Sequence, residues 1–107
     1  MNQHRALYRL PIDRAGKVSL EHKEAACRII DLTQEGVRLE TTLTVQTGER
    51  LWLSFDLTPD TPLRCQVEVL SVSTPYVGAR FVDLSPRSRH SLDTFIDDLL
   101  DTNFGGM

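Results

Sequence analysis

Alternation of apolar and polar residues is the feature that most restricts how this chain can fold. It is clearest in residues 51–57, where apolar side chains alternate with Trp52, Ser54 and Asp56. A period of two places the apolar side chains on one face of an extended strand, because successive side chains of a strand point to opposite sides. Similar patterns predict five further short strands, at residues 17–20, 26–32, 37–40, 63–69 and 77–82.

Two of these strands depart from simple alternation. Apolar residues occupy both parities of residues 26–32, so we expect that strand to be buried on much of both faces. After Val69 the apolar register slips by one, at Leu70 and Val72. Such a slip predicts a β-bulge or a bend, because one extra residue moves the side chains that follow to the other face.

The hydrophobic period changes near the C-terminus. Ser85 and Pro86 are typical of an N-cap and a first helical position, and Asn103 with two following glycines ends the segment, which predicts a helix over residues 86–103. Apolar residues with i, i+3, i+4 spacing form one stripe along it: Leu92, Phe95, Ile96, Leu99 and Leu100. Trp52 lies on the polar face of its strand and either packs under this helix, which we favour, or is exposed for a partner.

Six short strands with frequent turns favour a closed or nearly closed barrel, since closure removes unpaired strand edges. We therefore expect an all-β fold, a six-stranded antiparallel β-barrel over residues 15–84 with the amphipathic C-terminal helix across an open end or side. At 107 residues the chain has the size of a single domain, residues 1–107. Residues 1–12 are polar and basic without a clear period, and we expect them to form an arm that is mobile when free.

The charge distribution restricts the ligands this chain can take. The formal net charge is −3, which argues against a nucleic-acid polymer as partner, since such a partner requires a strong basic excess. The charge is nevertheless uneven, because Arg5, Arg9 and Arg14 lie within the first fourteen residues. A local cationic site on an acidic protein suits a small anionic ligand.

The two cysteines, Cys27 and Cys65, lie in apolar strand-like segments without metal-ligand spacing. We expect both to be reduced core residues, as is usual in cytosolic proteins. Residues 1–10 lack the apolar core of a signal peptide, and no apolar segment approaches the roughly 20 residues that span a bilayer. The expected location is therefore the cytoplasm, without membrane insertion, and a chain from Met1 to a Gly-Gly-Met end is consistent with a stand-alone protein.

Two short motifs carry the candidate chemistry. Arg5 and Arg9 are four residues apart, and arginine pairs bidentately with phosphate, binds guanine O6 and N7 and stacks on bases. With ten arginines in the chain this spacing is expected about once by chance, so it is weak by itself.

The second motif is Asp31-x-Thr33-x-x-Gly36, which is expected only about 0.08 times by chance. A carboxylate accepts hydrogen bonds from guanine N1 and N2, a hydroxyl two residues later lies on the same strand face, and a glycine allows a turn with positive φ and close approach of a ring. The alternative interpretation is an ordinary side-chain-stabilised turn at the end of a strand.

The order of these motifs resembles the PilZ domain family, which typically carries RxxxR followed by D/NxSxxG and binds the bacterial second messenger cyclic di-GMP. Arg5 and Arg9, Asp31 to Gly36, and a last strand at Gly78-Ala79-Arg80-Phe81 carry the resemblance, which covers essentially the whole chain. It implies that Arg5 and Arg9 clasp phosphate and guanine Hoogsteen edges. It also implies that Asp31 and Thr33 bind guanine polar edges and that Gly36 shapes the turn.

The resemblance leaves some positions open. Thr33 stands where serine is usual, which keeps the hydroxyl but adds a methyl group that either crowds the ligand or has no effect. The residue before the first arginine, here His4, bears on whether one ligand or a stacked pair is bound. Arg38 and Arg80 are possible secondary contacts with the ligand, or simply solvated strand residues.

The leading hypothesis is a monomeric cyclic di-GMP receptor that relays its signal to an unidentified protein partner in control of motility, biofilm or exopolysaccharide. The alternative is a nucleotide-independent PilZ-like adaptor in a motility or secretion assembly. An enzyme is not expected, because the sequence shows no nucleophile–base spacing, no metal-ligand cluster and no phosphate-binding glycine loop. An RNA-binding barrel is disfavoured by the net acidity. No metal or cofactor other than the ligand is expected.

Overall fold

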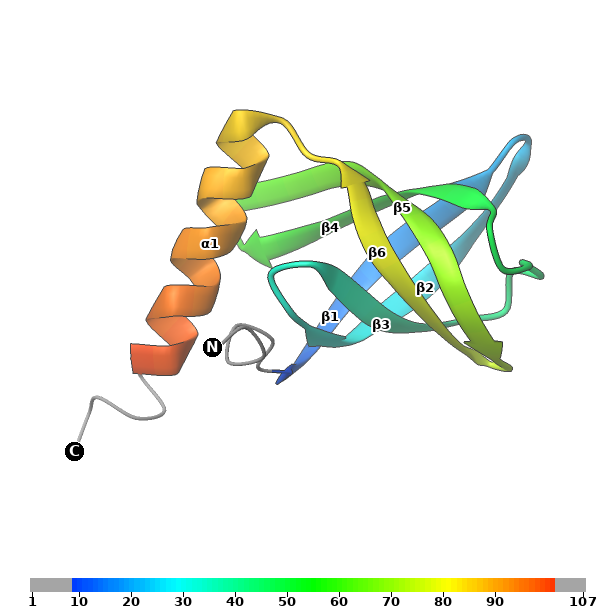
Figure 1. Ribbon diagram of the computed structural model, residues 1–107, viewed down its shortest axis with the longest axis horizontal. Helices are drawn as coiled ribbons and strands as arrows, with labels where there is room; N and C mark the ends of the chain where they lie inside the picture. Colours follow the sequence, from blue (N-terminus) through cyan, green and yellow to red (C-terminus); the bar gives the residue numbers. More distant parts are fainter. Residues whose placement is uncertain (1–8, 102–107) are drawn as a thin grey trace, which may run out of the picture.

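Six antiparallel strands and one helix make up the computed structural model, which describes residues 9–101 (Figure 1). The elements are β1 (Leu10–Leu20), β2 (Lys23–Leu32), β3 (Gly36–Thr41), β4 (Arg50–Thr58), β5 (Thr61–Ser73), β6 (Tyr76–Asp83) and α1 (Pro86–Leu100). The strands close into a barrel in the order β1-β2-β3-β6-β5-β4, with β4 pairing back onto β1. The predicted six-stranded antiparallel barrel with one C-terminal helix is confirmed.

The inner face of the barrel forms the core, as alternation predicted. Along β4 every second residue is buried, from Leu51 to Leu57, while the residues between them face outward. The prediction that residues 26–32 would be buried on both faces is wrong. Cys27 and Ile29 point inward, but Arg28 between them is exposed. A bulge at residue 30 then shifts the pairing with β3, which brings Leu32 back to the inner face.

The first strand is longer than the sequence predicted. It begins at Leu10, not at residue 17, so the barrel starts before residue 15 and the arm expected over residues 1–12 overlaps the strand. Leu10 is buried and pairs with Leu32, and the register shifts between Pro11 and Arg14. That irregularity interrupts the alternation by which a strand is recognised, which explains why the sequence placed the strand start too late.

Helix α1 stands across one end of the barrel (Figure 1). Its predicted start is confirmed, since Pro86 occupies the first turn and the Ser85 hydroxyl accepts a hydrogen bond from the Ser88 amide at 3.1 Å. Its buried residues, Leu92, Phe95 and Ile96, belong to the predicted apolar stripe. The predicted helix end at residue 103 lies outside the described residues.

Trp52 does not pack under this helix. Its side chain remains 40% exposed on the outer face of β4, and the Arg64 guanidinium lies 4.1 Å from the centre of its ring. The bulge predicted after Val69 is confirmed, because the pairing between β5 and β6 shifts from Val69–Ala79 to Ser71–Gly78. Leu70, the extra residue, is 54% exposed.

Both cysteines are free and buried, on β2 and β5. Burial raises the pKa of the Cys27 thiol to about 11. Burial, and to a smaller degree the negative charge of Asp83, raises the pKa of the Cys65 thiol to about 12. Both thiols are therefore protonated and inert in the folded protein near neutral pH.

We expect neither thiol to react with a disulfide-exchange reagent at about pH 8 in the native protein, and both to react in denaturant. Since the folded-state pKa values exceed the ordinary value of 9.0, the thiols stabilise the fold below that pH. This stabilisation is lost as the pH rises towards 11 and 12. Thermal unfolding of wild type and Cys65→Ala measures it, with a weaker decline above pH 9 expected in the variant. Rapid reaction of native protein would contradict the burial.

Candidate functional site

A cavity of about 500 Å³ lies on the outer face of the barrel, where β3, β6 and β5 are neighbours beside the turn between β2 and β3. Six residues singled out by sequence line it: Arg9, Asp31, Thr33, Gly36, Arg38 and Arg80. Their separation along the chain is large, so the barrel topology is what brings them together. Arg5 and His4 lie outside the described residues.

Arg9 and Asp31 meet at the edge of this cavity. Asp31 is fixed near the end of β2 by pairing with Pro11 on one side and Arg38 on the other. The Arg9 Nε lies 4.0 Å from the Asp31 Oδ1, and the Arg9 side chain is 65% exposed against 15% for Asp31. A long ion pair with one solvated partner contributes little stability, so Arg9 can exchange this contact for another anion at small cost.

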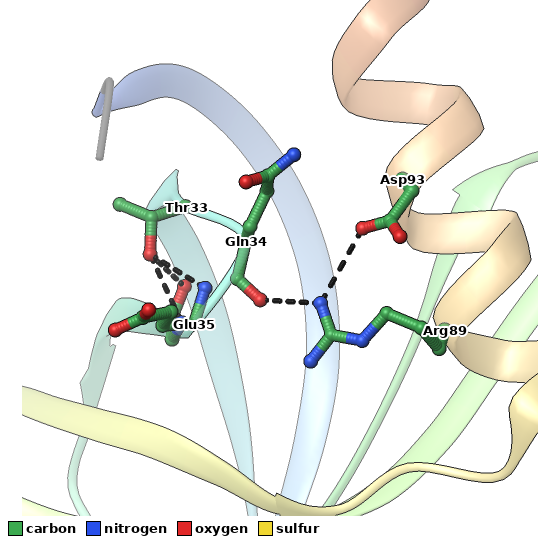
Figure 2. Close-up of polar contacts among 6 residues, drawn as sticks. Thr33, Gln34, Glu35, Arg89 and Asp93 are labelled. Atoms are coloured by element: carbon green, nitrogen blue, oxygen red, sulfur yellow. Dashed lines mark hydrogen bonds and ion pairs between the residues drawn. The ribbon is translucent and has the colours of Figure 1, made fainter. Parts of the chain in front are cut away.

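Thr33 builds the turn that follows Asp31. Its Oγ1 accepts hydrogen bonds from the amides of Glu35 at 3.1 Å and Gly36 at 3.0 Å, and donates to the Gly36 carbonyl at 3.4 Å (Figure 2). These contacts use the single donor and both acceptor positions of a hydroxyl. Thr33 therefore has a structural role of its own, and its predicted contact with a guanine edge stays a prediction.

Gly36 is required for a reason other than the predicted one. Positive φ occurs at Gly48, with φ 94°, and at Glu21, with φ 57°, but not at Gly36. A Cβ at Gly36 would collide with the carbonyl oxygen of Ala79 and come within 3.2 Å of the Arg80 Cα. The absent side chain thus permits close approach of the β3 and β6 backbones, and the expectation of positive φ is wrong.

Arg38 and Arg80 both point to the outer face and line the cavity. The Arg38 guanidinium lies 5.5 Å from the centre of the Tyr76 ring. The Arg80 Nη2 lies 2.5 Å from the Glu68 Oε1, which holds that side chain in place. Together with Arg9 they give the cavity three guanidinium groups, which favour an anionic occupant.

Apart from Arg80, sequence reasoning assigned no residue of the wall formed by β5 and β6 to the site. Besides Arg80 this wall contributes six residues with no place in either motif: Leu70, Ser71, Ser73, Tyr76, Gly78 and Ala79. The bulge at Leu70 was the available signal, because it turns that side chain outward beside the cavity. That these residues adjoin Arg38 follows from β3 pairing with β6, which the sequence does not specify.

Helix α1 holds the turn from the other side. The Arg89 Nη1 donates to the Gln34 carbonyl at 2.6 Å and lies 3.4 Å from the Asp93 Oδ1 (Figure 2). The Phe81 amide in β6 donates to the Glu35 carbonyl at 2.8 Å. The turn is therefore fixed to both the barrel and the helix.

Within residues 9–101, no group of three or more His, Cys, Asp or Glu side chains has an arrangement that could hold a metal ion. Over the same residues, no helix is long and apolar enough to cross a membrane.

Comparison with known proteins identifies the family. A PilZ domain model matches residues 3–98, and the chain therefore belongs to the PilZ domain family. No match was found among curated proteins.

Solved structures share the fold at low sequence identity. The PilZ domain of YcgR from Escherichia coli with c-di-GMP matches with TM-score 0.77 and 18% identity over 94% of this chain and 95% of that one. YcgR from Escherichia coli in complex with c-di-GMP matches with TM-score 0.76 and 20% identity, over 91% of this chain and 46% of that one. The Bacillus subtilis inhibitor of motility (MotI/DgrA) matches with TM-score 0.76 and 15% identity, over 94% and 53%. This chain thus spans about half the length of the last two proteins.

Removing the Thr33 hydroxyl should destabilise the turn. Thr33→Val keeps the shape of the side chain but removes the acceptor of the Glu35 and Gly36 amides. We expect the free energy of unfolding to fall by about 1 kcal/mol, which lowers the unfolding midpoint by roughly 4–8 °C. Thr33→Ser keeps the hydroxyl and should unfold close to wild type. Thermal unfolding followed by circular dichroism compares the three proteins, and equal midpoints for valine and wild type would contradict the structural role.

Proposed function

We propose that this protein is a receptor for cyclic di-GMP, that the cavity beside the Asp31–Gly36 turn is its binding site, and that the bound form is recognised by a protein partner. The observation that carries the proposal is the convergence of Arg9, Asp31 and Gly36 on one cavity with Arg38 and Arg80. The solved YcgR structures, which contain c-di-GMP and share this fold, support it.

The chemistry of the cavity suits a guanine dinucleotide. Guanidinium groups of Arg9, Arg38 and Arg80 match phosphate oxygens and the acceptor edge of guanine, N7 and O6. The Asp31 carboxylate is an acceptor for the N1 and N2 hydrogens at the opposite edge of the base. A volume of about 500 Å³ is within the usual range for small-molecule sites. Binding of this kind needs no catalytic group, so the proposed role is that of a receptor and not of an enzyme.

Signal relay is proposed through the turn. A ligand that contacts Asp31 or the following residues alters a segment that Arg89 joins directly to α1. The surface formed by the turn and the helix is therefore a place where a partner could distinguish the bound from the free protein. We further propose that the protein acts as a monomer in the cytoplasm, a reducing compartment with which the free thiols of Cys27 and Cys65 are compatible.

Calorimetric titration with cyclic di-GMP, with cyclic di-AMP as the control ligand, tests the proposal. We expect binding of the guanine ligand only, at micromolar or lower dissociation constant, and the molar ratio gives the stoichiometry. Arg9→Ala should weaken binding about 100-fold, since a bidentate charged contact is lost, without unfolding the barrel. Asp31→Ala should weaken binding about tenfold and reduce the preference for guanine.

Arg50→Ala is the matched control, because Arg50 is an exposed arginine of β4 that does not line the cavity. Its affinity should equal that of wild type. Absence of heat together with an unchanged unfolding midpoint in excess ligand would overturn the receptor proposal and favour the nucleotide-independent adaptor. Unfolding of Arg9→Ala would contradict the position of Arg9 outside the core.

A further inference from the structure

Gly78 occupies a position whose backbone conformation does not require glycine. It lies within β6 between buried Val77 and Ala79, points to the outer face, and has no positive φ. A glycine inside a strand weakens it, because the unfolded chain loses more conformational freedom on folding and no side chain packs on the neighbouring strands. Its presence there calls for another explanation.

Packing within the protein does not explain why residue 78 is a glycine. A Cβ at Gly78 would meet one described atom within 4 Å beyond its chain neighbours, the Ser71 Oγ at 2.7 Å. That atom is the end of an exposed side chain, which can rotate away. At Gly36, by contrast, a Cβ would meet main-chain atoms of Ala79 and Arg80, which cannot. Gly36 is therefore explained by the approach of two strands, and Gly78 is not.

Because Gly78 has no side chain, its main chain forms part of the cavity wall. It pairs with Arg38 on β3 and with Ser71 on β5, so it lies in the middle of the cavity's strand wall. Arg80, two residues along on the same face, lines the cavity too, and Tyr76, two residues before, is the ring over which Arg38 lies. A patch of bare main chain thus lies among two guanidinium groups and an aromatic ring.

We infer that Gly78 forms the floor on which one purine base of the ligand lies flat, and that Arg38 and Arg80 border that base. This inference rests on the proposed function and adds a residue outside both motifs that decides whether the ligand fits. Bare main chain accepts a flat ring at van der Waals distance, which a side chain would prevent. Guanidinium groups are suited to the edge and the face of a base.

Adding a side chain at residue 78 should therefore reduce affinity while the fold stays intact. We expect Gly78→Val to weaken cyclic di-GMP binding at least 30-fold and Gly78→Ala about 3- to 10-fold in calorimetric titration. The unfolding midpoint of Gly78→Ala should stay at or above that of wild type, because the substitution restricts the unfolded chain and its Cβ meets only a movable hydroxyl. Ala26→Val, which enlarges an exposed side chain of β2 that does not line the cavity, is the matched control and should bind as wild type does.

A double variant separates an effect of the substitution on binding from an effect on folding. Gly78→Ala combined with Ser71→Ala removes the one atom that the new Cβ would meet, and it should unfold like wild type and still bind more weakly. Wild-type affinity in Gly78→Val and in the double variant would overturn the inference and leave the receptor proposal standing. No binding by wild type would overturn both, so the two failures are distinguishable.

Discussion

Close packing of the β3 backbone against β6 at Gly36 is the contact on which the rest of the site depends. Pairing of Gly36 with Arg80 joins β3 to β6 in the closed barrel, although two strands, β4 and β5, lie between them in the sequence. The same contact fixes where the turn after Asp31 ends, since the Phe81 amide binds the Glu35 carbonyl. The cavity is therefore a product of strand pairing, and loss of that pairing would separate its two walls.

The cavity is rich in arginine although the protein as a whole is acidic. The chain carries a net charge of −3, yet three arginines line a cavity of about 500 Å³. Two of them are steadied by neighbours, Arg38 by the Tyr76 ring and Arg80 by Glu68, whereas Arg9 is largely solvated. Three guanidinium groups at one cavity favour an anionic occupant, despite the net negative charge of the whole chain.

Sequence alone predicted the number of strands, the helix start and the motif residues, because these depend on local periodicity and capping. It placed β1 too late, since an irregularity between Pro11 and Arg14 hides the alternation there. It assigned Gly36 a positive φ because the crowding against Ala79 comes from a strand more than 40 residues away. Tyr76, Ser71 and Gly78 were not assigned to the site for the same reason, as strand order is a tertiary property that no local pattern contains.

The contact between α1 and the turn has an implication for how this family member can vary. Arg89 binds the main-chain carbonyl of Gln34, not its side chain (Figure 2). Every amino acid has that carbonyl, so substitutions at position 34 leave the acceptor in place, while position 89 must supply a long donor. A substitution at position 34 is thus compatible with an unchanged connection between the turn and α1. The outer side chains of the turn can therefore change while the hydrogen bond between Arg89 and the Gln34 carbonyl is kept.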